Sequence, residues 1–378
     1  MNTGAKLSSS NRPLVVFAYA FPHRKTQDFL IELLVAGHTD LTVIGAPIKK
    51  LAHVDRTQYF RSSLRRPIGP ETSVLCRALG LSYVEAEHDD FETISRVARH
   101  SGARMAIISG ARILNRRAID IFSDGVLNLH PGKLPQTAGL DSFYYSITYN
   151  VPLGVTAHFI DHRIDAGYEL FFEETPVNPS DTPEIMLENN YQSQIVALRR
   201  FLTILALGKL KTVPIDRPIK NDPMAPEAKH AALLKLPEWQ AEQYLSQQAR
   251  QLIAAIEGDD QDRVRTILSH HPTLLERRTT QGWTPLIVAC HHGRTSIAKL
   301  LLESGADPNL AGRKGTTPLM YAKTRLLGQP QVEYELLEIL LAAGARINLS
   351  DAEGRDIIFY VERAGDTQMA KWLTERMG

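Results

Sequence analysis

The sequence predicts an α/β domain built on an open parallel sheet, followed by an all-α solenoid of stacked repeats. From residue 14 to residue 130, short apolar runs alternate with segments of helical period, an order typical of parallel strands joined by crossover helices. Later in the chain, Gly282-Trp-Thr-Pro-Leu286 recurs as Gly315-Thr-Thr-Pro-Leu319, 33 residues on. Repetition at that period is typical of a helical solenoid. A length of 378 residues leaves room for two or three domains.

The composition is that of an ordinary globular protein, with 43% hydrophobic and 22% charged residues. The formal net charge of +1 gives no global basic field, which argues against nucleic acid as a partner, including a tRNA substrate. No stretch approaches the roughly 20 apolar residues of a membrane span. Cys76 and Cys290 are more than 200 residues apart and suit a reducing compartment. We therefore expect a cytoplasmic protein without a membrane or metal site.

The elements can be predicted in order along the chain. Residues 1–12 are polar and Ser-rich, so we expect them to be disordered. The apolar run at 14–21 is short for a signal peptide and suits a buried first strand better. The predicted strands are 14–21, 41–46, 82–86, 105–109 and 126–130. The predicted helices between them are 26–36, 71–79, 90–100 and 115–122.

The last of these strands carries two polar side chains at its carboxyl end. Side chains alternate along a strand, so Val126, Asn128 and His130 lie on one face, and the last two are about 7 Å apart. Pro131 cannot donate to a sheet ladder, so the strand ends there. Ligands of open α/β sheets bind at such ends. The alternative is that both groups are hydrogen-bonded polar residues of a core.

A second segment supplies a carboxylate. Residues 154–161 alternate like a strand, and the following turn contains Asp165 and Gly167, where glycine allows a tight backbone. A carboxamide, an imidazole and a carboxylate that meet at strand ends suit acyl transfer to an amine. The amide can donate to an oxyanion, the imidazole can take a proton, and the carboxylate can orient the imidazole.

Together these segments resemble the folate-dependent formyltransferases over roughly residues 13–210. The resemblance rests on Asn128-Leu-His130-Pro131-Gly132-Lys-Leu134-Pro135, Gly154-Val-Thr-Ala-His158-Phe-Ile-Asp161 and Asp165-Ala-Gly167. It implies N10-formyltetrahydrofolate as the formyl donor, and Asn128, His130 and Asp165 as the catalytic residues. It also implies a structural role for His158. Many members carry an Arg-Gly pair where this chain has Ala138-Gly139, so an arginine anchor for an anionic substrate is not implied there.

The resemblance extends to segments that bind the donor. Residues 105–114 are similar to the family segment whose backbone grips the folate pterin, and an ordinary buried strand and turn is the alternative. The predicted cofactor-binding residues are Gly110, Ala111, Arg112, Ile113, Leu114 and Asp161.

The loop after the first strand bears on the acceptor substrate. Residues 20–26 contain no glycine, so the loop has neither a dinucleotide cradle nor the glycine-rich phosphate loop of the purine-pathway glycinamide ribonucleotide formyltransferases. A short basic run at a helix N-terminus could still meet a phosphate, or could be a solvated turn. Gly139-Leu-Asp141 and the aromatic residues after it resemble the sugar N-formyltransferases, which act on nucleotide-linked amino sugars. The predicted substrate-binding residues are His23, Arg24, Lys25, Lys133 and Asp141.

The C-terminal third resembles ankyrin repeats, which have a period near 33 and T-P-L openings. Gly305-Ala-Asp307 recurs as Gly344-Ala-Arg346 after 39 residues, and the six extra residues predict a loop insertion around 326–331. Residues 252–275 resemble a divergent opening repeat, and residues 354–377 a closing one. We therefore place the formyltransferase domain at 13–210 and the repeats at 245–378. The Pro-rich segment 211–244 is predicted to be an extended connector, with a candidate role in packing a homodimer.

Ankyrin repeats are a binding architecture. Trp283 has His291, His292 and Tyr321 nearby in the repeat pattern, so it could stack on the base of a second nucleotide ligand. Packing between repeats is the alternative use of this tryptophan. A protein ligand on the repeats also remains open.

The implied function is transfer of a formyl group from N10-formyltetrahydrofolate to the amine of a nucleotide-linked amino sugar. A dTDP-linked amino-dideoxyhexose for the O-antigen of lipopolysaccharide is an example. One alternative is an ankyrin interaction protein with an inactive formyltransferase-like domain. The other is a different folate formyltransferase, or a deformylase that transfers to water.

Overall fold

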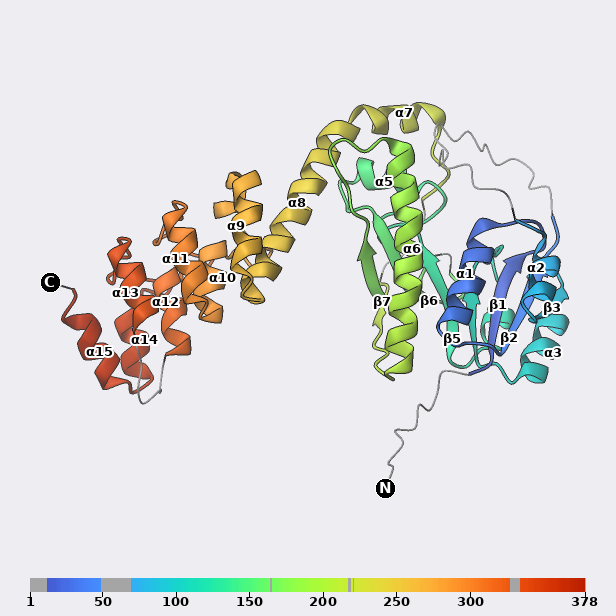
Figure 1. Cartoon of the computed structure of the whole chain (residues 1–378), viewed down its shortest axis with the longest axis horizontal. Coiled ribbons are helices and arrows are strands. Elements are labelled where there is room, and N and C mark those ends of the chain that lie inside the picture. The colour runs from blue at the N-terminus through green and yellow to red at the C-terminus, as the bar shows by residue number, and fades with distance from the viewer. Residues whose placement is uncertain are drawn as a thin grey trace, which may run out of the picture. The chain divides into compact units, whose positions relative to one another are not determined.

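The computed structural model describes residues 12–48, 69–163, 165–216, 219, 221–326 and 334–377. They form two compact units, the first ending at Gln243 and the second starting at Tyr244 (Figure 1). The expected disorder at residues 1–11 and the insertion at 327–331 lie outside the described residues.

In the described residues, the first unit is built on one eight-stranded sheet in the order β3-β2-β1-β4-β5-β6-β7-β8. Strands β1 to β5 run parallel, as predicted, and β5 to β8 are paired antiparallel. The parallel strands are β1 (Leu14–Tyr19), β2 (Leu41–Ala46), β3 (Ser82–Glu85), β4 (Met105–Ile108) and β5 (Gly125–His130). The antiparallel strands are β6 (Gly154–Ile160), β7 (Gly167–Glu174) and β8 (Val213–Pro214).

The α/β class is confirmed, but the sheet is mixed and not wholly parallel. Only the six residues 161–166 join β6 to β7. A crossover between parallel strands needs a dozen residues or more, whereas a short turn joins antiparallel neighbours. The length of this turn therefore reverses the chain and brings its residues back over the sheet.

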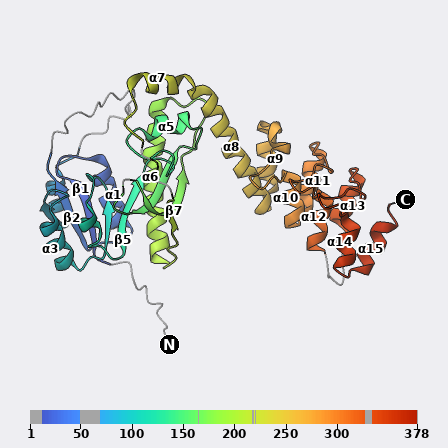
Figure 2. The ribbon, with the colours of Figure 1, turned by 180° about the vertical axis from the view of Figure 1, so that it is seen from behind.

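Helices cover both faces of the sheet, as Figures 1 and 2 show. One apolar cluster joins the sheet to α1 (Arg24–Val35), α2 (Thr72–Ala78) and α6 (Pro183–Ala206). The other cluster joins it to α3 (Phe91–Ser101) and α4 (Arg116–Ile119). Leu127 and Leu129 of β5 belong to the first cluster and Val126 to the second. Asn128 and His130 therefore point to the side of Val126, as the alternation predicts.

The prediction of an extended connector at 211–244 is wrong for its second half. After β8 the chain forms α7 (Pro226–Leu234) and then α8 (Leu236–Glu257), which runs from the first unit into the second. Pro226 and Pro237 stand in the first turns of these helices, where proline removes no intrahelical hydrogen bond. α7 and the start of α8 pack with α5 (Ser142–Thr148) in a small apolar cluster.

The second unit consists of helices stacked around one apolar core. In the T-P-L segments, Thr284 and Thr317 are N-caps that accept main-chain hydrogen bonds, and Pro285 and Pro318 take the first helical positions. The repeat pattern is thus a helix-start signal. Its helices are the end of α8, α9 (Gln261–His270), α10 (Pro285–His292), α11 (Thr295–Glu303), α12 (Pro318–Ala322), α13 (Glu335–Ala342), α14 (Ile357–Arg363) and α15 (Thr367–Thr374).

Among the described helices of either unit, none is both long and apolar enough to cross a bilayer.

Candidate functional site

The carboxyl end of β5 holds a hydrogen-bonded pair. Antiparallel pairing sets Asn128 opposite His158 of β6, and the Asn128 Nδ2 atom lies 3.1 Å from His158 Nε2. His158 Nδ1 lies 3.1 Å from the main-chain oxygen of Ala166 and can only donate to it. His158 Nε2 is therefore the acceptor, and Asn128 donates to it through one of its two amide protons. The second proton of Asn128 is left for another acceptor.

His158 is held neutral, which this arrangement requires. Its side chain is fully buried, and burial, with the nearby charge of His130, lowers its pKa to about 4. A proton on Nε2 would remove the acceptor that orients the Asn128 amide. The structural role implied for His158 is therefore specific: it sets which way Asn128 donates.

His130 lies between two hydrogen-bond acceptors. Its Nε2 atom is 2.9 Å from the main-chain oxygen of Thr137, and its Nδ1 atom is 3.4 Å from Asp165 Oδ1. A carbonyl and a carboxylate both need a donor, so both contacts are satisfied together only when the imidazole carries two protons. The arrangement of the two acceptors therefore suits an imidazole with a proton on each ring nitrogen.

Asp165 is brought to His130 by the turn between β6 and β7. It has a positive φ of 47°, and Asp165 Oδ2 accepts a hydrogen bond of 2.7 Å from the Gly139 N–H. Burial opposes its ionisation, but the hydrogen bond and charge of His130 and the Gly139 N–H outweigh burial and lower the pKa of Asp165. Gly167 closes the turn, since a Cβ there would lie 2.1 Å from the Phe159 oxygen.

The turn after β5 is fixed by Thr156, which faces His130 across the ladder. Its hydroxyl donates to the Gly132 oxygen at 2.6 Å and accepts from the Leu134 N–H at 3.0 Å. A Cβ on Gly132 would meet the Thr137 hydroxyl at 2.2 Å. The structure thus brings together the three predicted catalytic residues, Asn128, His130 and Asp165.

The predicted cofactor-binding loop follows β4, the neighbour of β5. The Gly110 N–H donates to the Phe17 oxygen, and the Ala111 oxygen accepts from the Tyr19 hydroxyl. The guanidinium of Arg112 pairs with Glu87, and the main-chain N–H of Arg112 donates to His88 Nδ1. Leu114 is buried in the core, whereas Ile113 is 72% exposed. In this loop Ile113 therefore offers apolar surface to a ligand.

Asp161 lies at the other end of β5. It pairs with Arg163 and lines a cavity of about 600 Å³ that includes Gly125, the first residue of the strand. Ile160, just before it, packs in the cluster that also holds Leu114, so both predicted cofactor segments flank one face of the sheet. In the part of the chain described, no group of three or more His, Cys, Asp or Glu residues is placed to hold a metal ion.

The side chains of His23, Arg24 and Lys25, at the start of α1, contact different parts of the first unit. Arg24 forms two hydrogen bonds with Glu188 of α6, at 2.7 and 2.6 Å. His23 contacts the Thr26 hydroxyl, and burial followed by the charge of Lys25 lowers its pKa to about 4. Lys25 lies beside β5, with Nζ 3.4 Å from the Leu129 oxygen, and burial lowers its pKa to about 8. Lys25 therefore contacts β5, the strand that carries Asn128 and His130.

The two remaining predicted substrate-binding residues have partners inside the first unit. Lys133 Nζ lies 4.2 Å from the ring centroid of Phe172. Asp141 forms a buried ion pair of 2.9 Å with Lys229 of α7 and accepts from the Met224 N–H. Asp141 therefore joins the turn before α5 to the start of α7.

The site also contains residues that the sequence analysis missed. Thr137 supplies an acceptor to His130, Thr156 fixes the turn after β5, and Asn221 binds the loop that contains Thr137. Thr156 stands within a recognised motif, two residues before His158, and alternation places both on one face. Thr137 acts through its main chain, so its residue type carries no signal.

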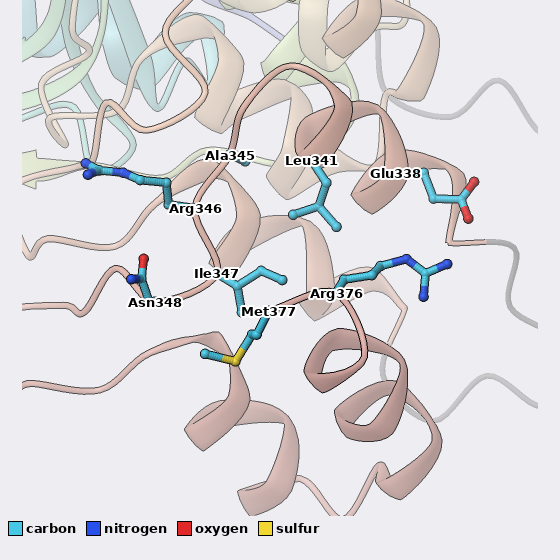
Figure 3. Close-up of a pocket in the computed structure, with 8 residues that line it drawn as sticks. All are labelled: Glu338, Leu341, Ala345, Arg346, Ile347, Asn348, Arg376 and Met377. Atoms are coloured by element: carbon cyan, nitrogen blue, oxygen red, sulfur yellow. The ribbon is translucent and has the colours of Figure 1, made fainter.

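A cavity of about 730 Å³ lies in the second unit, far along the sequence from these residues. It is formed by α13, the turn at 345–348 and the last turn after α15. Figure 3 shows Leu341 and Ile347 between the charged side chains of Arg346 and Glu338, with Met377 next to Ile347.

We expect acid to destabilise the first unit through His158. The unfolded chain takes up a proton here near pH 6.5, while the folded protein stays neutral down to about pH 4. The stabilisation is complete above pH 6.5 and is lost as the pH falls toward 4, by at most about 3 kcal/mol. In scanning calorimetry, His158→Gln should lose less thermal stability between pH 6.5 and 4 than the unsubstituted protein. His100→Gln, on the exposed side of α3, should behave like the unsubstituted protein. An unchanged pH slope in His158→Gln would contradict the assignment.

Comparison with known proteins identifies both parts of the chain. Residues 69–198 match the formyl transferase family, and residues 252–351 match a model of three ankyrin repeats. The chain thus carries a formyl transferase domain and C-terminal ankyrin repeats, as the motifs predict.

Individual proteins that resemble this chain match it at low sequence identity and over parts of their length. The trifunctional purine biosynthetic protein adenosine-3 of Gallus gallus is 28% identical over 120 residues, which are 31% of this chain and 12% of that protein. Methionyl-tRNA formyltransferase of Moorella thermoacetica is 24% identical over 210 residues, which are 53% of this chain and 64% of that protein. The 2-5A-dependent ribonuclease of Homo sapiens is 38% identical over 71 residues, 19% of this chain and 10% of that protein. The chain spans less than two thirds of each of these relatives.

Among solved structures, phosphoribosylglycinamide formyltransferase from Anaplasma phagocytophilum is similar, with 16% identity and a TM-score of 0.42. The match covers 54% of this chain and 94% of that one.

Proposed function

We propose that the first unit transfers the formyl group of N10-formyltetrahydrofolate to the amine of a nucleotide-linked amino sugar. The observation that carries the proposal is the meeting of Asn128, His130 and Asp165 at the carboxyl end of β5. An inactive formyltransferase-like domain would not be expected to retain all three residues, with Asn128 bonded to His158 and His130 beside Asp165. This argues against a chain that serves only for interaction.

The donor supplies a formyl carbon bound to a nitrogen that can leave. The exposed Ile113, beside a loop whose backbone passes the carboxyl end of β4, fits the flat ring of such a donor. Asn128 presents its second amide proton to the oxyanion that forms when the amine attacks. A site that holds donor and amine together also removes much of the entropic barrier.

The protonated His130 has two roles in this scheme. Its charge stabilises the oxyanion, and its Nε2 proton, once released from the Thr137 oxygen, can pass to the leaving nitrogen. The amine attacks as the neutral species, and the ammonium that this attack generates returns a proton to His130. One C–N bond thus forms, one breaks, and the imidazolium is restored. Asp165 keeps His130 charged and oriented. The products are tetrahydrofolate and a sugar formamide.

Three observations favour a nucleotide sugar over the substrates named for the relatives. The loop after β1 has no glycine to cradle a phosphate monoester, and Arg24 is engaged by Glu188. A net charge of +1 gives little attraction for tRNA. The Gly139-Leu-Asp141 turn, held to α7 by Lys229, resembles that of sugar N-formyltransferases. A dTDP-linked amino-dideoxyhexose of the kind built into O-antigen is the acceptor we favour.

The experiment is a comparison of acceptors with the full chain and N10-formyltetrahydrofolate. The panel contains dTDP- and UDP-linked amino sugars, phosphoribosylglycinamide, methionyl-tRNA and water. Formation of tetrahydrofolate with one amino sugar, at a kcat/KM at least about 100-fold above the other acceptors, is the expected result. Preference for phosphoribosylglycinamide, methionyl-tRNA or water would replace the proposal by that activity.

We also propose that the ankyrin unit binds a second nucleotide. The ring of Trp283 lies 4.9 Å from that of His291 and 5.0 Å from that of Tyr321, and Trp283 is only partly buried. Such a ring group can stack on a nucleobase, a contact worth about 1–3 kcal/mol per base.

Replacing Trp283 by alanine is expected to weaken binding of the free nucleotide to the second unit at least about fivefold while kcat is retained. Isothermal titration with dTDP on the full chain measures this. Trp372→Ala removes a ring that packs on Tyr334 in the closing repeat and is the matched control. Equal affinities in the two variants would mean that Trp283 serves packing alone.

A further inference from the structure

The loop at 136–139 contacts two of the three catalytic side chains through its main chain. The Thr137 oxygen accepts from His130 Nε2 at 2.9 Å, and the Gly139 N–H donates to Asp165 Oδ2 at 2.7 Å. A loop displaced by a fraction of an ångström would lose both contacts. The geometry of His130 and Asp165 therefore depends on what holds this loop.

Asn221 holds it from a distant part of the sequence. Its Nδ2 atom donates to the Gln136 oxygen and to the Ala138 oxygen, each at 2.9 Å. These carbonyls belong to the residues on either side of Thr137. Two hydrogen bonds from one amide fix the orientation of the peptide units between them, and so fix the direction of the Thr137 carbonyl.

Asn221 is itself anchored by neighbouring contacts. The Tyr149 hydroxyl lies 3.3 Å from its Oδ1 atom, and the Tyr145 hydroxyl donates to the Asp222 oxygen at 2.7 Å. The ion pair of Asp141 with Lys229 ties the same loop to α7. A Cβ on Gly139 would lie 3.1 Å from the Asn221 oxygen, so the two segments are in close contact.

We propose that Asn221 is a positioning residue for the reaction, acting through the Thr137 carbonyl on the protonation of His130. The expected changes in kcat rest on the proposed function, whereas the expected change in the titration of His130 does not. The ionisable groups around His130 are Asp165 from the turn before β7, His158 from β6 and Lys25 from α1. With the Thr137 carbonyl free to turn away, His130 loses one of the two acceptors that favour its imidazolium. His130 should then release a proton at lower pH.

The test uses Asn221→Ala and the isosteric Asn221→Asp in the full chain. Asn221→Asp keeps the shape but replaces the donor by an acceptor that repels the two carbonyls. We expect kcat to fall about 10–100-fold, as for a misplaced catalytic group, with KM for either substrate changed less than about threefold. The alkaline limb of the pH–kcat profile should move to lower pH.

Asn309→Ala is the matched control. Asn309 also bridges main-chain groups, donating to the Gly344 oxygen at 2.9 Å and accepting from the Arg346 N–H at 2.8 Å, but it does so in the ankyrin unit. The kcat and the pH profile of the Asn309→Ala variant should equal those of the unsubstituted protein.

A readout without substrate separates this inference from the proposed function. NMR of labelled histidine side chains, with His130 assigned from His130→Asn, gives its titration in the free protein. A titration midpoint lowered by about half a unit or more in either Asn221 variant supports the inference, whatever the acceptor proves to be. An unchanged midpoint in both folded variants, or a loss of kcat with an unchanged pH profile, would overturn it.

Discussion

Replacing Asn128 by alanine is expected to lower kcat by about 10²–10³, the usual cost of losing one oxyanion donor. His158 takes one proton of the Asn128 amide and leaves the other for a further acceptor. Alanine removes that donor and leaves His158 Nε2 without its partner. Steady-state rates at saturating donor and acceptor measure the effect, and KM should change little.

The split between kcat and KM decides what Asn128 does. An effect confined to KM would mean that Asn128 holds substrate and stabilises no transition state. Circular dichroism and the thermal midpoint of Asn128→Ala provide the folding control, because His158 is buried and loses a hydrogen bond in this variant.

Replacing His130 by asparagine, or Asp165 by asparagine, is expected to lower kcat by at least about 100-fold. The first change removes the imidazolium from the carboxyl end of β5. The second removes the carboxylate that lies 3.4 Å from His130 Nδ1. Single-turnover rates with bound donor isolate the chemical step from product release.

His162→Asn tests the specificity of these two changes. His162 is an exposed residue of the same turn between β6 and β7, so its replacement should leave kcat near normal. Turnover within a few-fold of normal in a folded His130→Asn or Asp165→Asn variant would remove both residues from the mechanism.

The sequence predicted the part of the site that lies on strands. Alternation along β5 fixed the face of Asn128 and His130, and the proline after them ended the strand. The sequence places Asp165 in the turn after β6, but the distance of Asp165 from His130 depends on how that turn folds back. Asn221 lies 84 residues beyond Thr137 and acts on main-chain oxygens, which leave no mark on the sequence between them.

The errors have similar causes. Alternating strand and helix patterns predict parallel strands, and only the short turn between β6 and β7 carries a signal for an antiparallel pair. The pairs β5–β6 and β7–β8 are antiparallel although long connections with helices join them, so connection length does not reveal their orientation. Prolines suggested an extended connector, yet they stand at the helix starts of α7 and α8. The basic residues 23–25 were predicted to bind substrate, because the sequence does not show which acidic side chains pair with them. Glu188, which forms hydrogen bonds with Arg24, lies 164 residues later.

The six-residue turn that joins β6 to β7 contributes to two sets of contacts in the site. In the first set, the Ala166 oxygen accepts from His158 Nδ1, which leaves His158 Nε2 to accept from the amide of Asn128. In the second set, the carboxylate of Asp165 contacts His130 Nδ1 directly. A gain or loss of one residue in this turn is expected to disturb the Asn128–His158 pair and the His130–Asp165 pair at the same time. The spacing between Asp165 and Ala166 therefore sets the geometry of both pairs together.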